Sequence, residues 1–366
     1  MKKSVLIISY VPNYNRQGYD FAECLRNSGY DARLFQMDGV TDCEKGIIGI
    51  KCRKPHGVFH KLHMLRNLLA FFLKTVFVKK DIVVCVGKPM LMLGGIYNIF
   101  FGSKLVWYSL EYSKLGYVNR YVYQKCVTGY IDVEENRRDA IFAEYGKKQS
   151  SIVCYNMPHL HEKPITGGRL REYLKVKYGL SGDEQLVVYA GSFQGYACLD
   201  NIVDASCGFP PGMKLVLMVY GLPDALKNSS PNCCVVPPVS GDGFYEWLAD
   251  ADCALLPYES YDDFNVLNCS PQKIFDCYVV GVPYVASNRP IVRKVLAAYP
   301  SCGLLCDFNN VDSIREVVGS MVCLKDKVSR GMRKVHRDKM NYDSLTGELA
   351  EFLRSVDGSC REDENA

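Results

Sequence analysis

The chain has 366 residues, of which 48% are apolar and 23% charged, a composition that excludes collagen-like, coiled-coil and largely disordered proteins. This length suits two domains of about 150 to 180 residues each. The net charge is only +4, too small a total to indicate an avid nucleic-acid binder. Its distribution is uneven, because residues 1–80 hold 14 basic and 6 acidic residues, a net of +8, while the other 286 residues have a net of −4.

The 17 cysteines are scattered singly and form no C-x-x-C pair, so we expect free thiols in a reducing compartment and no structural zinc site. The N-terminus leads directly into a short apolar strand, which predicts no secretion signal. The most apolar later stretch, Ile82–Phe101, is interrupted by Lys88-Pro89 and Gly94-Gly95 and does not suit a membrane span. These features predict a cytoplasmic protein.

The first half of the chain alternates between buried-type strands and helices. The stretch Ser4–Tyr10 is a continuous apolar run, Gly18–Ser28 is amphipathic, and Asp31–Gln36 is again strand-like, which together predict a βαβ unit. Further predicted elements are the strands Ile82–Val86, Lys104–Leu110 and Tyr130–Val133 and the helix Glu134–Tyr145. The pattern is typical of a doubly wound α/β domain.

The second half repeats this alternation after a linker-like stretch, Asn156–Arg169, which is rich in Pro, Gly and His. Five predicted strands each end at a small or turn-forming residue, and a mostly helical segment, Val311–Leu353, follows them. These strands are Gln185–Ala190, Lys214–Tyr220, Cys233–Pro237, Cys253–Pro257 and Pro283–Ser287.

The sequence therefore predicts an α/β protein with two Rossmann-like doubly wound domains that face a cleft. We expect an N-terminal domain over residues 1–158 and a C-terminal domain over residues 170–335, joined by a linker at 159–169. A helix over residues 336–356 is expected to pack back on the N-terminal domain, and residues 357–366 are expected to form a tail.

The segment Tyr258–Ser287 carries the clearest chemical signal. Ser270 suits the N-cap of a helix, Pro271 its first position, and Gly281 its end. The free amides at the start of such a helix, together with Lys273 in the first turn, would attract a phosphate. Asp276 lies on the same face and could accept hydrogen bonds from ribose hydroxyls. The alternative is an ordinary surface helix with an exposed Lys273–Asp276 ion pair.

This segment, with its pattern S-P-x-K-x-F-D followed by G-x-P, resembles the donor site of family 4 glycosyltransferases of the GT-B fold. In that family two glutamates eight positions apart flank the helix start. Asp276 occupies the place of the second, which binds the nucleotide ribose. Asn268 replaces the first, which faces the donor sugar, and its neutral amide cannot supply a carboxylate. The resemblance implies a nucleotide-sugar donor and retention of anomeric configuration. The helix-end amides and Lys273 would stabilise the departing diphosphate, and no D-x-D stands in the expected loop, so no metal or other cofactor is predicted.

The resemblance also implies roles for shorter matches. Gly191 and Ser192 correspond to a loop that faces the diphosphate, although the Arg and Lys common there are absent from Phe193–Tyr196. The segment around Val239 corresponds to the base-binding region, and Gly18 to a glycine-rich loop. Gly221 closes another strand and completes the predicted nucleotide-sugar site of Gly18, Gly191, Ser192, Gly221, Val239, Asn268, Ser270, Lys273 and Asp276. Plain β/α turns are the alternative for the glycines.

In the N-terminal half, Glu111 follows a strand at the point where many relatives have a histidine. A carboxylate there could orient or deprotonate an acceptor hydroxyl, so Glu111 and Lys273 are the predicted catalytic residues. A loop acid paired with Lys114 or Arg120 is the alternative. The charged run Glu134–Arg138 is expected either to support this site or to begin a solvated helix.

Residues 45–80 contain nine Lys or Arg and no acid, and their leucines and phenylalanines between Leu62 and Val76 follow helical spacing. A basic amphipathic helix of this kind suits a membrane surface with anionic lipid. The alternative is a helix whose apolar stripe faces the core of its own domain. An RNA partner is not predicted, since no nucleic-acid motif accompanies the charge.

Taken together, the sequence predicts a glycosyltransferase, either a hexosyl- or an N-acetylhexosaminyltransferase, that uses a UDP- or GDP-sugar. The acceptor is expected to be a lipid-linked saccharide at the inner face of the membrane, in surface polysaccharide or glycolipid synthesis. Two alternatives remain: a non-catalytic scaffold of a polysaccharide assembly complex, which Asn268 and the missing basic residues after Gly191 favour, and a nucleotide-sugar epimerase.

Overall fold

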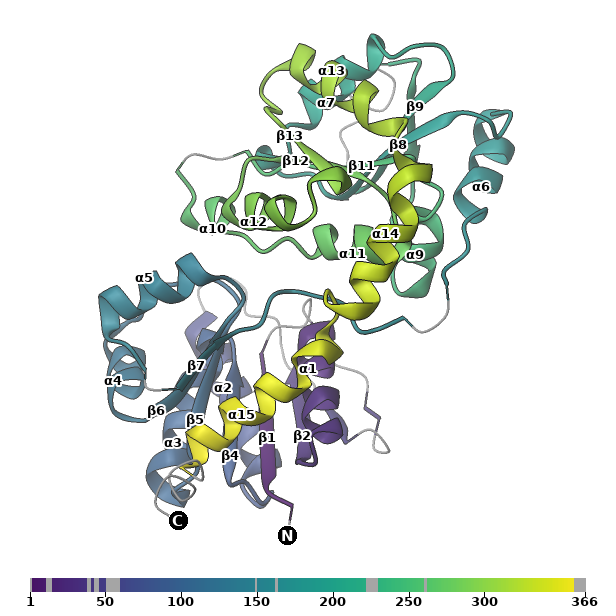
Figure 1. Cartoon of the computed structure of the whole chain (residues 1–366). Coiled ribbons are helices and arrows are strands. Elements are labelled where there is room, and N and C mark those ends of the chain that lie inside the picture. Colours follow the sequence, from purple (N-terminus) through teal and green to yellow (C-terminus); the bar gives the residue numbers. More distant parts are fainter. Residues whose placement is uncertain are drawn as a thin grey trace. The chain divides into compact units, whose positions relative to one another are not determined.

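The computed structural model of the chain describes residues 2–10, 15–37, 41–42, 46–50, 60–148, 150–161, 164–221, 230–259 and 262–358. It divides into two compact units (Figure 1). The N-terminal unit comprises Met1–Asn156 together with Tyr342–Ala366, and the C-terminal unit comprises Met157–Asn341. Each unit is built around one parallel sheet with helices on both faces, so the predicted α/β class is confirmed.

The sheet of the N-terminal unit has seven strands in the order β3-β2-β1-β4-β5-β6-β7, all parallel. The strands are β1 (Ser4–Ser9), β2 (Asp31–Met37), β3 (Ile47–Ile50), β4 (Ile82–Val86), β5 (Lys104–Ser109), β6 (Val127–Asp132) and β7 (Ser150–Val153). The sequence predicted five of them. The two that it missed, β3 and β7, are short strands at the edges of the sheet, where half-exposed residues replace the continuous apolar pattern.

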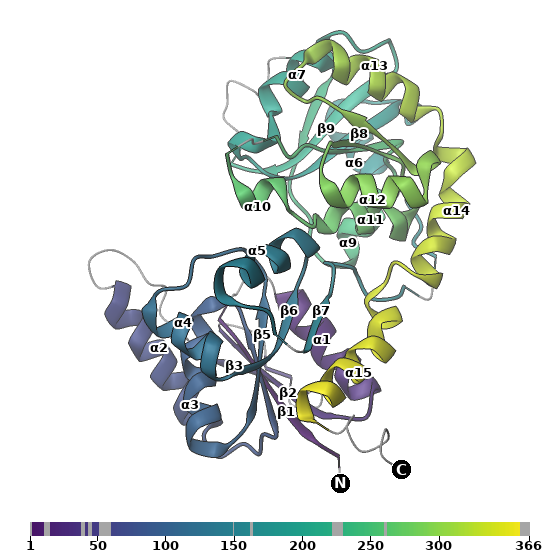
Figure 2. The same cartoon turned by 60° about the vertical axis from the view of Figure 1, so that its left-hand side comes forward.

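Two helical layers cover this sheet. One layer contains α1 (Asn15–Asn27) and α15 (Thr346–Asp357), and the other contains α2 (His60–Thr75), α3 (Leu91–Phe101), α4 (Tyr117–Lys125) and α5 (Glu135–Tyr145) (Figures 1 and 2). The second layer encloses a hydrophobic core, in which Phe71 and Tyr97 pack with Trp107 of β5.

The C-terminal helix α15 belongs to the N-terminal unit. Its Val356 packs so closely on β6 that a Cβ on Gly129 would lie 2.5 Å from Val356 Cγ2, so this strand position requires glycine. Ser355 Oγ also donates a hydrogen bond to Ser150 Oγ over 2.8 Å. The end of the chain therefore completes the domain in which the chain begins.

The sheet of the C-terminal unit has the order β10-β9-β8-β11-β12-β13, and every pairing is parallel. Its strands are β8 (Gln185–Ser192), β9 (Met213–Tyr220), β10 (Cys233–Val236), β11 (Cys253–Leu256), β12 (Tyr284–Ser287) and β13 (Gly303–Cys306). The prediction of five strands was wrong by one. The missed strand, β13, is a four-residue edge strand whose Leu304 and Leu305 are partly exposed, so it lacks the signature of a buried strand.

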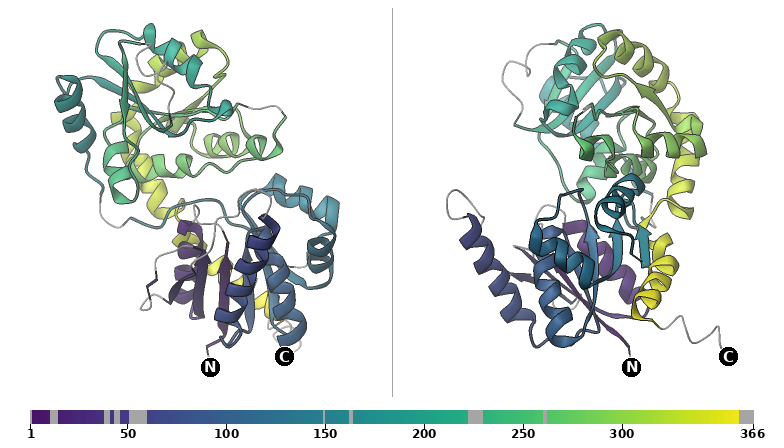
Figure 3. Two further views of the ribbon diagram at one scale, coloured as in Figure 1. Left: turned by 180° about the vertical axis from the view of Figure 1, so that it is seen from behind. Right: turned by 90° about the vertical axis from the view of Figure 1, so that its left-hand side faces the viewer.

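Helices again cover both faces of this second sheet (Figure 3). One face carries α7 (Leu199–Cys207) and α13 (Val311–Val322), which pack on each other and share a core with the strands. The other face carries α6 (Arg169–Tyr178), α9 (Asp242–Leu248), α11 (Gln272–Val280) and α14 (Lys325–Asp338); α10 (Phe264–Leu267) and α12 (Pro290–Ala298) lie in the loops beside β11 and β12.

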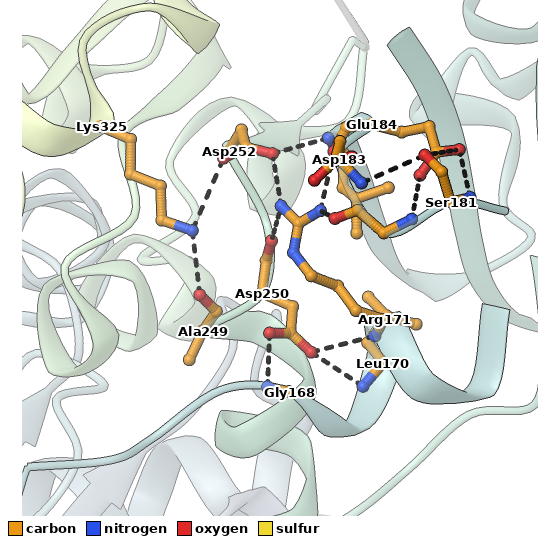
Figure 4. A network of polar contacts seen from close by, with 12 residues as sticks. Gly168, Leu170, Arg171, Ser181, Asp183, Glu184, Ala249, Asp250, Asp252 and Lys325 are labelled. Atoms are coloured by element: carbon orange, nitrogen blue, oxygen red, sulfur yellow. Dashed lines mark hydrogen bonds and ion pairs between the residues drawn. The ribbon is translucent and has the colours of Figure 1, made fainter. Parts of the chain in front are cut away.

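A polar network fixes the start of α6 to the segment before β11 (Figure 4). The Asp250 carboxylate accepts hydrogen bonds from the backbone N–H groups of Gly168, Leu170 and Arg171, and so satisfies free amides at the beginning of the helix. The Arg171 guanidinium in turn donates to Asp252 over 3.0 Å. This network anchors the first helix of the C-terminal unit.

The strand order of each sheet reverses direction once, between β1 and β4 in the N-terminal unit and between β8 and β11 in the C-terminal unit. Doubly wound sheets bind ligands at such a switch point, at the carboxyl ends of the strands. The loops that follow β8 and β11 are therefore the first place to look for a site in the C-terminal unit.

Candidate functional site

A glycine and two tyrosines lie at the β8/β11 switch point, in the last residues of β8 and in the loop after β11. Gly191 and Ser192 are the last residues of β8, and Tyr258 follows β11 by two positions. The hydroxyl of Tyr189 donates a hydrogen bond to the carbonyl of Ser192 over 2.9 Å, and this bond holds the last residue of the strand in place. The predicted site residues Gly191 and Ser192 thus lie where a doubly wound sheet binds ligands.

Helix α11 follows β11, and its first turn lies at the same edge of the sheet. It starts at Gln272 with Pro271 as its N-cap, and no side chain caps its first turn. The prediction that Ser270 is the N-cap was wrong by one residue, because Pro271 keeps an extended ψ of 118° and does not enter the helix; Ser270 itself is buried just before it. The helix ends as predicted at Gly281, whose φ of 74° favours glycine.

Lys273, in the first turn of α11, points at the Gly191 backbone. A Cβ on Gly191 would lie only 2.5 Å from Lys273 Nζ, so the amine occupies the space that a side chain there would need. Burial lowers the pKa of Lys273 to about 8, although the nearby Asp276 carboxylate acts in the opposite direction. The site therefore holds a partly desolvated amine beside the free backbone amides of a helix start, which is an arrangement suited to an anion.

Asp276 lies one turn further along α11 and is buried, with only 4% of its surface exposed. Its Oδ1 accepts a hydrogen bond of 2.8 Å from the hydroxyl of Tyr245 in α9. Seven consecutive residues of α11, from Ile274 to Val280, are buried, so the alternative of an exposed surface helix with a solvated ion pair was wrong. A ribose bound by Asp276 would share the carboxylate with Tyr245.

Asn268 stands at the end of the short helix α10. Its Nδ2 donates to the carbonyl of Phe264 over 3.1 Å, so in this structure the amide closes the last turn of α10. The side chain lies five residues before Lys273 and is half-buried. Its predicted contact with a donor sugar stays a prediction.

The remaining predicted nucleotide-sugar residues occupy turns. Gly221 directly follows β9 with a φ of 69°, and Val239 lies half-buried in the loop between β10 and α9. Because β8, β9 and β10 are parallel neighbours, these two residues lie at the same sheet edge as Gly191. Gly18 differs from the expectation, because α1 begins three residues earlier and Gly18 packs inside its first turn, where a Cβ would meet Leu34 Cδ1 at 3.4 Å.

In the N-terminal unit, Glu111 is exposed in the loop after β5. Ser109, the last residue of that strand, donates through its hydroxyl to the Glu111 carbonyl over 3.1 Å. The carboxylate is therefore presented to solvent from a loop held by the strand that precedes it, as an acid that contacts an acceptor must be.

Behind this loop lies a buried cluster of Asp132, Glu134 and Arg137. Asp132 ends β6 and accepts hydrogen bonds from the Tyr130 hydroxyl and from the backbone N–H of Val133. Glu134 caps α5 by accepting from the Arg137 N–H over 3.1 Å. Burial raises the pKa of Asp132 to about 7 and also raises that of Glu134. Glu134 and Arg137 are buried, so a solvated helix start does not describe these two members of the run Glu134–Arg138.

Arg137 connects this cluster to the Glu111 loop. Its Nη1 donates to the carbonyl of Leu110 over 2.8 Å, directly before Glu111. The Arg137 guanidinium of α5 thus braces the loop that carries Glu111.

Sequence reasoning missed the tyrosines around Lys273. The amine lies 4.9 Å from the ring centroid of Tyr189 and 5.7 Å from that of Tyr258. The available signal was that each ring lies within four residues of the end of a predicted strand.

Comparisons with known proteins identify the fold. No family model and no curated protein matches the chain. Solved structures do: a sucrose-phosphate synthase from Thermosynechococcus elongatus (TM-score 0.73, 12% identity, covering 98% of this chain and 100% of that one), a glycosyltransferase from Rickettsia africae (0.71, 10%, 97% and 98%) and Anabaena HepE in complex with UDP (0.67, 13%, 97% and 100%).

The chain has the GT-B fold. The similarity extends over nearly the full length of both partners in each comparison, so neither unit is an unrelated addition. Within the described residues, we find no helix long and apolar enough to cross a bilayer. In the same part of the chain, no group of three or more His, Cys, Asp or Glu side chains is gathered as a metal site.

Proposed function

We propose that the protein is a glycosyltransferase that moves a sugar from a UDP- or GDP-sugar to a saccharide acceptor. The observation that carries this proposal is the Lys273 amine, which lies against Gly191 at the switch point of the C-terminal sheet. Structures of similar fold are glycosyltransferases, and HepE is described with UDP and with UDP-glucose. Together these support a donor held by the C-terminal unit.

In this proposal Lys273 and the first amides of α11 stabilise the diphosphate as it leaves the sugar. Negative charge grows on the leaving group in the transition state, and fixed donors in a partly water-excluded site stabilise that charge strongly. Asp276 would bind the ribose and Asn268 would bind hydroxyls of the sugar. We propose that the reaction retains the anomeric configuration and proceeds without a metal, so activity should persist in EDTA.

Glu111 is the proposed group that orients or deprotonates the acceptor hydroxyl. It is exposed, and its loop is braced by Ser109 and Arg137. Glu111→Gln should lower kcat by about 100-fold, the usual scale of general-base catalysis, while donor affinity stays unchanged. Equal kcat values for this variant and the wild type would remove Glu111 from the mechanism.

We further propose that the acceptor is lipid-linked and that the N-terminal unit binds the cytoplasmic surface of a membrane, as expected of an enzyme of surface polysaccharide or glycolipid synthesis. Helix α2 supports this, because its inner face packs Leu68 and Phe71 into the core while its outer face leaves large apolar side chains in solvent. These exposed side chains are Leu62 (61% exposed), Leu65 (59%), Leu69 (54%) and Leu73 (62%).

Charge accompanies this apolar face. Arg66, Lys74 and Lys79 are exposed on or just after α2. Lys80 has another role, since its ammonium donates to the carbonyls of Thr75, Val76 and Val78 and so caps the end of the helix. The basic residues Lys45, Lys51, Arg53 and Lys54, and the side chain of Lys61, lie outside the described residues. A basic helix with exposed leucines suits an anionic lipid surface.

The scaffold alternative keeps one supporting observation, the engagement of the Asn268 amide with Phe264. A thermal-shift screen separates the possibilities. A true donor nucleotide at about 100 times its Kd should stabilise the protein by about 2.7 kcal/mol. Stabilisation by a UDP- or GDP-sugar, together with sugar transfer to an acceptor extract, would support the glycosyltransferase. Turnover of the donor without any acceptor would support an epimerase. The absence of stabilisation by every nucleotide sugar would favour the scaffold.

A further inference from the structure

Lys273 lies between two aromatic rings that the proposed chemistry has not yet used. Its Nζ is 4.9 Å from the centroid of Tyr189 and 5.7 Å from that of Tyr258, and both distances are within the range of a cation–π interaction. One ring comes from strand β8 and the other from the loop after β11. Strand β8 and the loop after β11 therefore each supply one ring to the same ammonium at the switch point. We call this pair, Tyr189 and Tyr258, the tyrosine cradle.

Both rings of the cradle are fixed by contacts that do not involve Lys273. The Tyr189 ring is buried, and its hydroxyl donates to the Ser192 carbonyl over 2.9 Å. The Tyr258 ring stacks on Tyr196 at 5.6 Å between centroids with an interplanar angle of 9°, and its backbone N–H donates to Ser287 Oγ over 2.8 Å. The cradle is therefore formed before any ligand arrives, which reduces the entropy lost on binding.

The third wall of this arrangement is the backbone of Gly191. A Cβ at this position would lie 2.5 Å from Lys273 Nζ and 2.8 Å from the Tyr189 hydroxyl oxygen. The ammonium thus fills the space above a glycine at the end of β8. In the sequence no basic residue follows in Phe193–Tyr196, so Lys273 supplies the charge at this loop.

We propose that Tyr189 and Tyr258 are positioning residues that hold the Lys273 ammonium against the Gly191 loop, where it binds the diphosphate of a nucleotide. This inference rests on the proposed function and extends it to how the diphosphate is recognised. A flexible lysine loses rotamer freedom when it binds a phosphate, whereas a lysine already held between two rings loses little.

The proposal also predicts that diphosphate binding depends on pH. Burial lowers the pKa of Lys273 to about 8, and a bound diphosphate favours the charged amine and so raises that pKa. Binding then takes up a proton, and affinity for a nucleoside diphosphate should fall about tenfold between pH 7 and pH 9. The titratable residues around the amine are Asp276, Cys269, Cys277 and the two tyrosines of the cradle. Burial holds the pKa of Tyr189, Tyr258 and Cys277 well above this window.

The test is calorimetric titration of the full chain with UDP, GDP and ADP, and then with the monophosphate of the base that binds best. Tyr189→Leu and Tyr258→Leu remove a ring, whereas Tyr189→Phe and Tyr258→Phe keep it. We expect each leucine variant to lose about tenfold in diphosphate affinity and each phenylalanine variant to lose less than threefold, with monophosphate affinity unchanged in all four. The monophosphate result also shows that each variant is folded.

The chain offers a matched control for the ring substitutions. Lys177 on α6 also lies over two tyrosine rings, 5.5 Å from Tyr173 and 5.1 Å from Tyr178. Tyr173→Leu removes the same type of contact elsewhere and should leave diphosphate affinity as in the wild type.

The pH dependence is tested by Lys273→Arg and Cys269→Ser. Arginine stays charged throughout, so Lys273→Arg should abolish the loss of affinity between pH 7 and pH 9, whereas Cys269→Ser should keep it. Leucine variants that bind diphosphate as well as the wild type would overturn the cradle and leave the proposed function standing. If no nucleoside diphosphate binds the wild type at all, both are wrong.

Discussion

The two units use their surfaces in opposite ways. Among the described residues, eleven of the exposed large apolar side chains lie between Leu62 and Tyr121 in the N-terminal unit, on or next to α2, α3 and α4, and six are spread over the C-terminal unit. Figure 2 shows these three helices along one side of the N-terminal unit. Apolar patches of this kind mark interaction surfaces. This difference underlies our proposals that the N-terminal unit meets a membrane surface and that the C-terminal unit binds a nucleotide sugar.

The charged groups at the two candidate sites are also held differently. The N-terminal unit buries Asp132, Glu134 and Arg137 as a cluster that braces a loop, and presents Glu111 to solvent. The C-terminal unit places one amine, Lys273, between rings at a sheet edge. The Lys273 amine is held by two rings and the Gly191 backbone, whereas Asp132, Glu134 and Arg137 are held mainly by hydrogen bonds to backbone groups.

Lys273→Ala should give the largest effect, and it tests the role that we propose for the C-terminal unit. Removal of a preorganised donor from a developing negative charge costs about 2.7 to 4 kcal/mol, so donor kcat/KM should fall by 100-fold or more. The measurement is initial-rate kinetics with a radiolabelled nucleotide sugar. Lys175→Ala, at an exposed position of α6, is the control and should behave as the wild type. Similar losses in both variants would refute a specific role for Lys273.

The next largest effect should come from the exposed face of α2. Replacement of Leu65, Leu69 and Leu73 by Gln should reduce sedimentation with vesicles of phosphatidylcholine and phosphatidylglycerol by about 100-fold, since each half-exposed leucine that enters lipid contributes about 1 kcal/mol. The thermal unfolding midpoint should not fall, because these side chains already face solvent. Val176→Gln, an exposed apolar position of the C-terminal unit, is the control. Wild-type binding that does not depend on anionic lipid would contradict the membrane proposal.

The fold could be predicted from the sequence because its central strands are continuous apolar runs. Ser4–Ser9 and Ile82–Val86 are buried at every position, a pattern that only a strand covered on both faces requires. The edge strands could not be predicted in the same way. Half-exposed edge strands such as β3 and β13 depend on pairing with neighbours that the local sequence does not reveal.

The candidate site was predictable in part for a similar reason. Lys273, Asp276 and Gly281 follow from local helix chemistry and from the family pattern. Tyr189 and Tyr245 did not, because their roles depend on contacts between distant segments: Tyr189 reaches Lys273 from β8, and Tyr245 reaches Asp276 from α9. The exposed leucines of α2 were equally hidden, since a helical repeat of leucines does not show which of its faces the sheet covers.

Gly191→Ala tests the position of the Lys273 amine in the C-terminal unit and should give a smaller effect. The new methyl group would displace Lys273 Nζ, the flexible end of its side chain, and would also press on the buried Tyr189 hydroxyl at 2.8 Å, so the amine should leave the cradle and stability should fall modestly. We expect nucleoside diphosphate affinity to fall about tenfold in calorimetric titration, with the unfolding midpoint kept within a few degrees. Gly195→Ala, where a Cβ would meet no atom within 4 Å, is the matched control. An unchanged affinity would show that the amine does not need the space above Gly191.

The smallest effect concerns the buried cluster of the N-terminal unit and appears in stability. Burial raises the pKa of Asp132 to about 7, above the value of about 3.9 for an unfolded Asp. The folded state therefore keeps this proton to higher pH than the unfolded state, so the stabilisation is complete below about pH 4 and is lost as pH rises to about 7. Between pH 5 and pH 7 the free energy of unfolding should fall by roughly 1 kcal/mol per pH unit relative to Asp132→Asn, as measured by urea denaturation. Asp139→Asn, an exposed position on the same α5, should keep the wild-type slope. Parallel pH profiles for the wild type and Asp132→Asn would mean that the cluster holds Asp132 as an ordinary carboxylate, matched by the charge of Arg137.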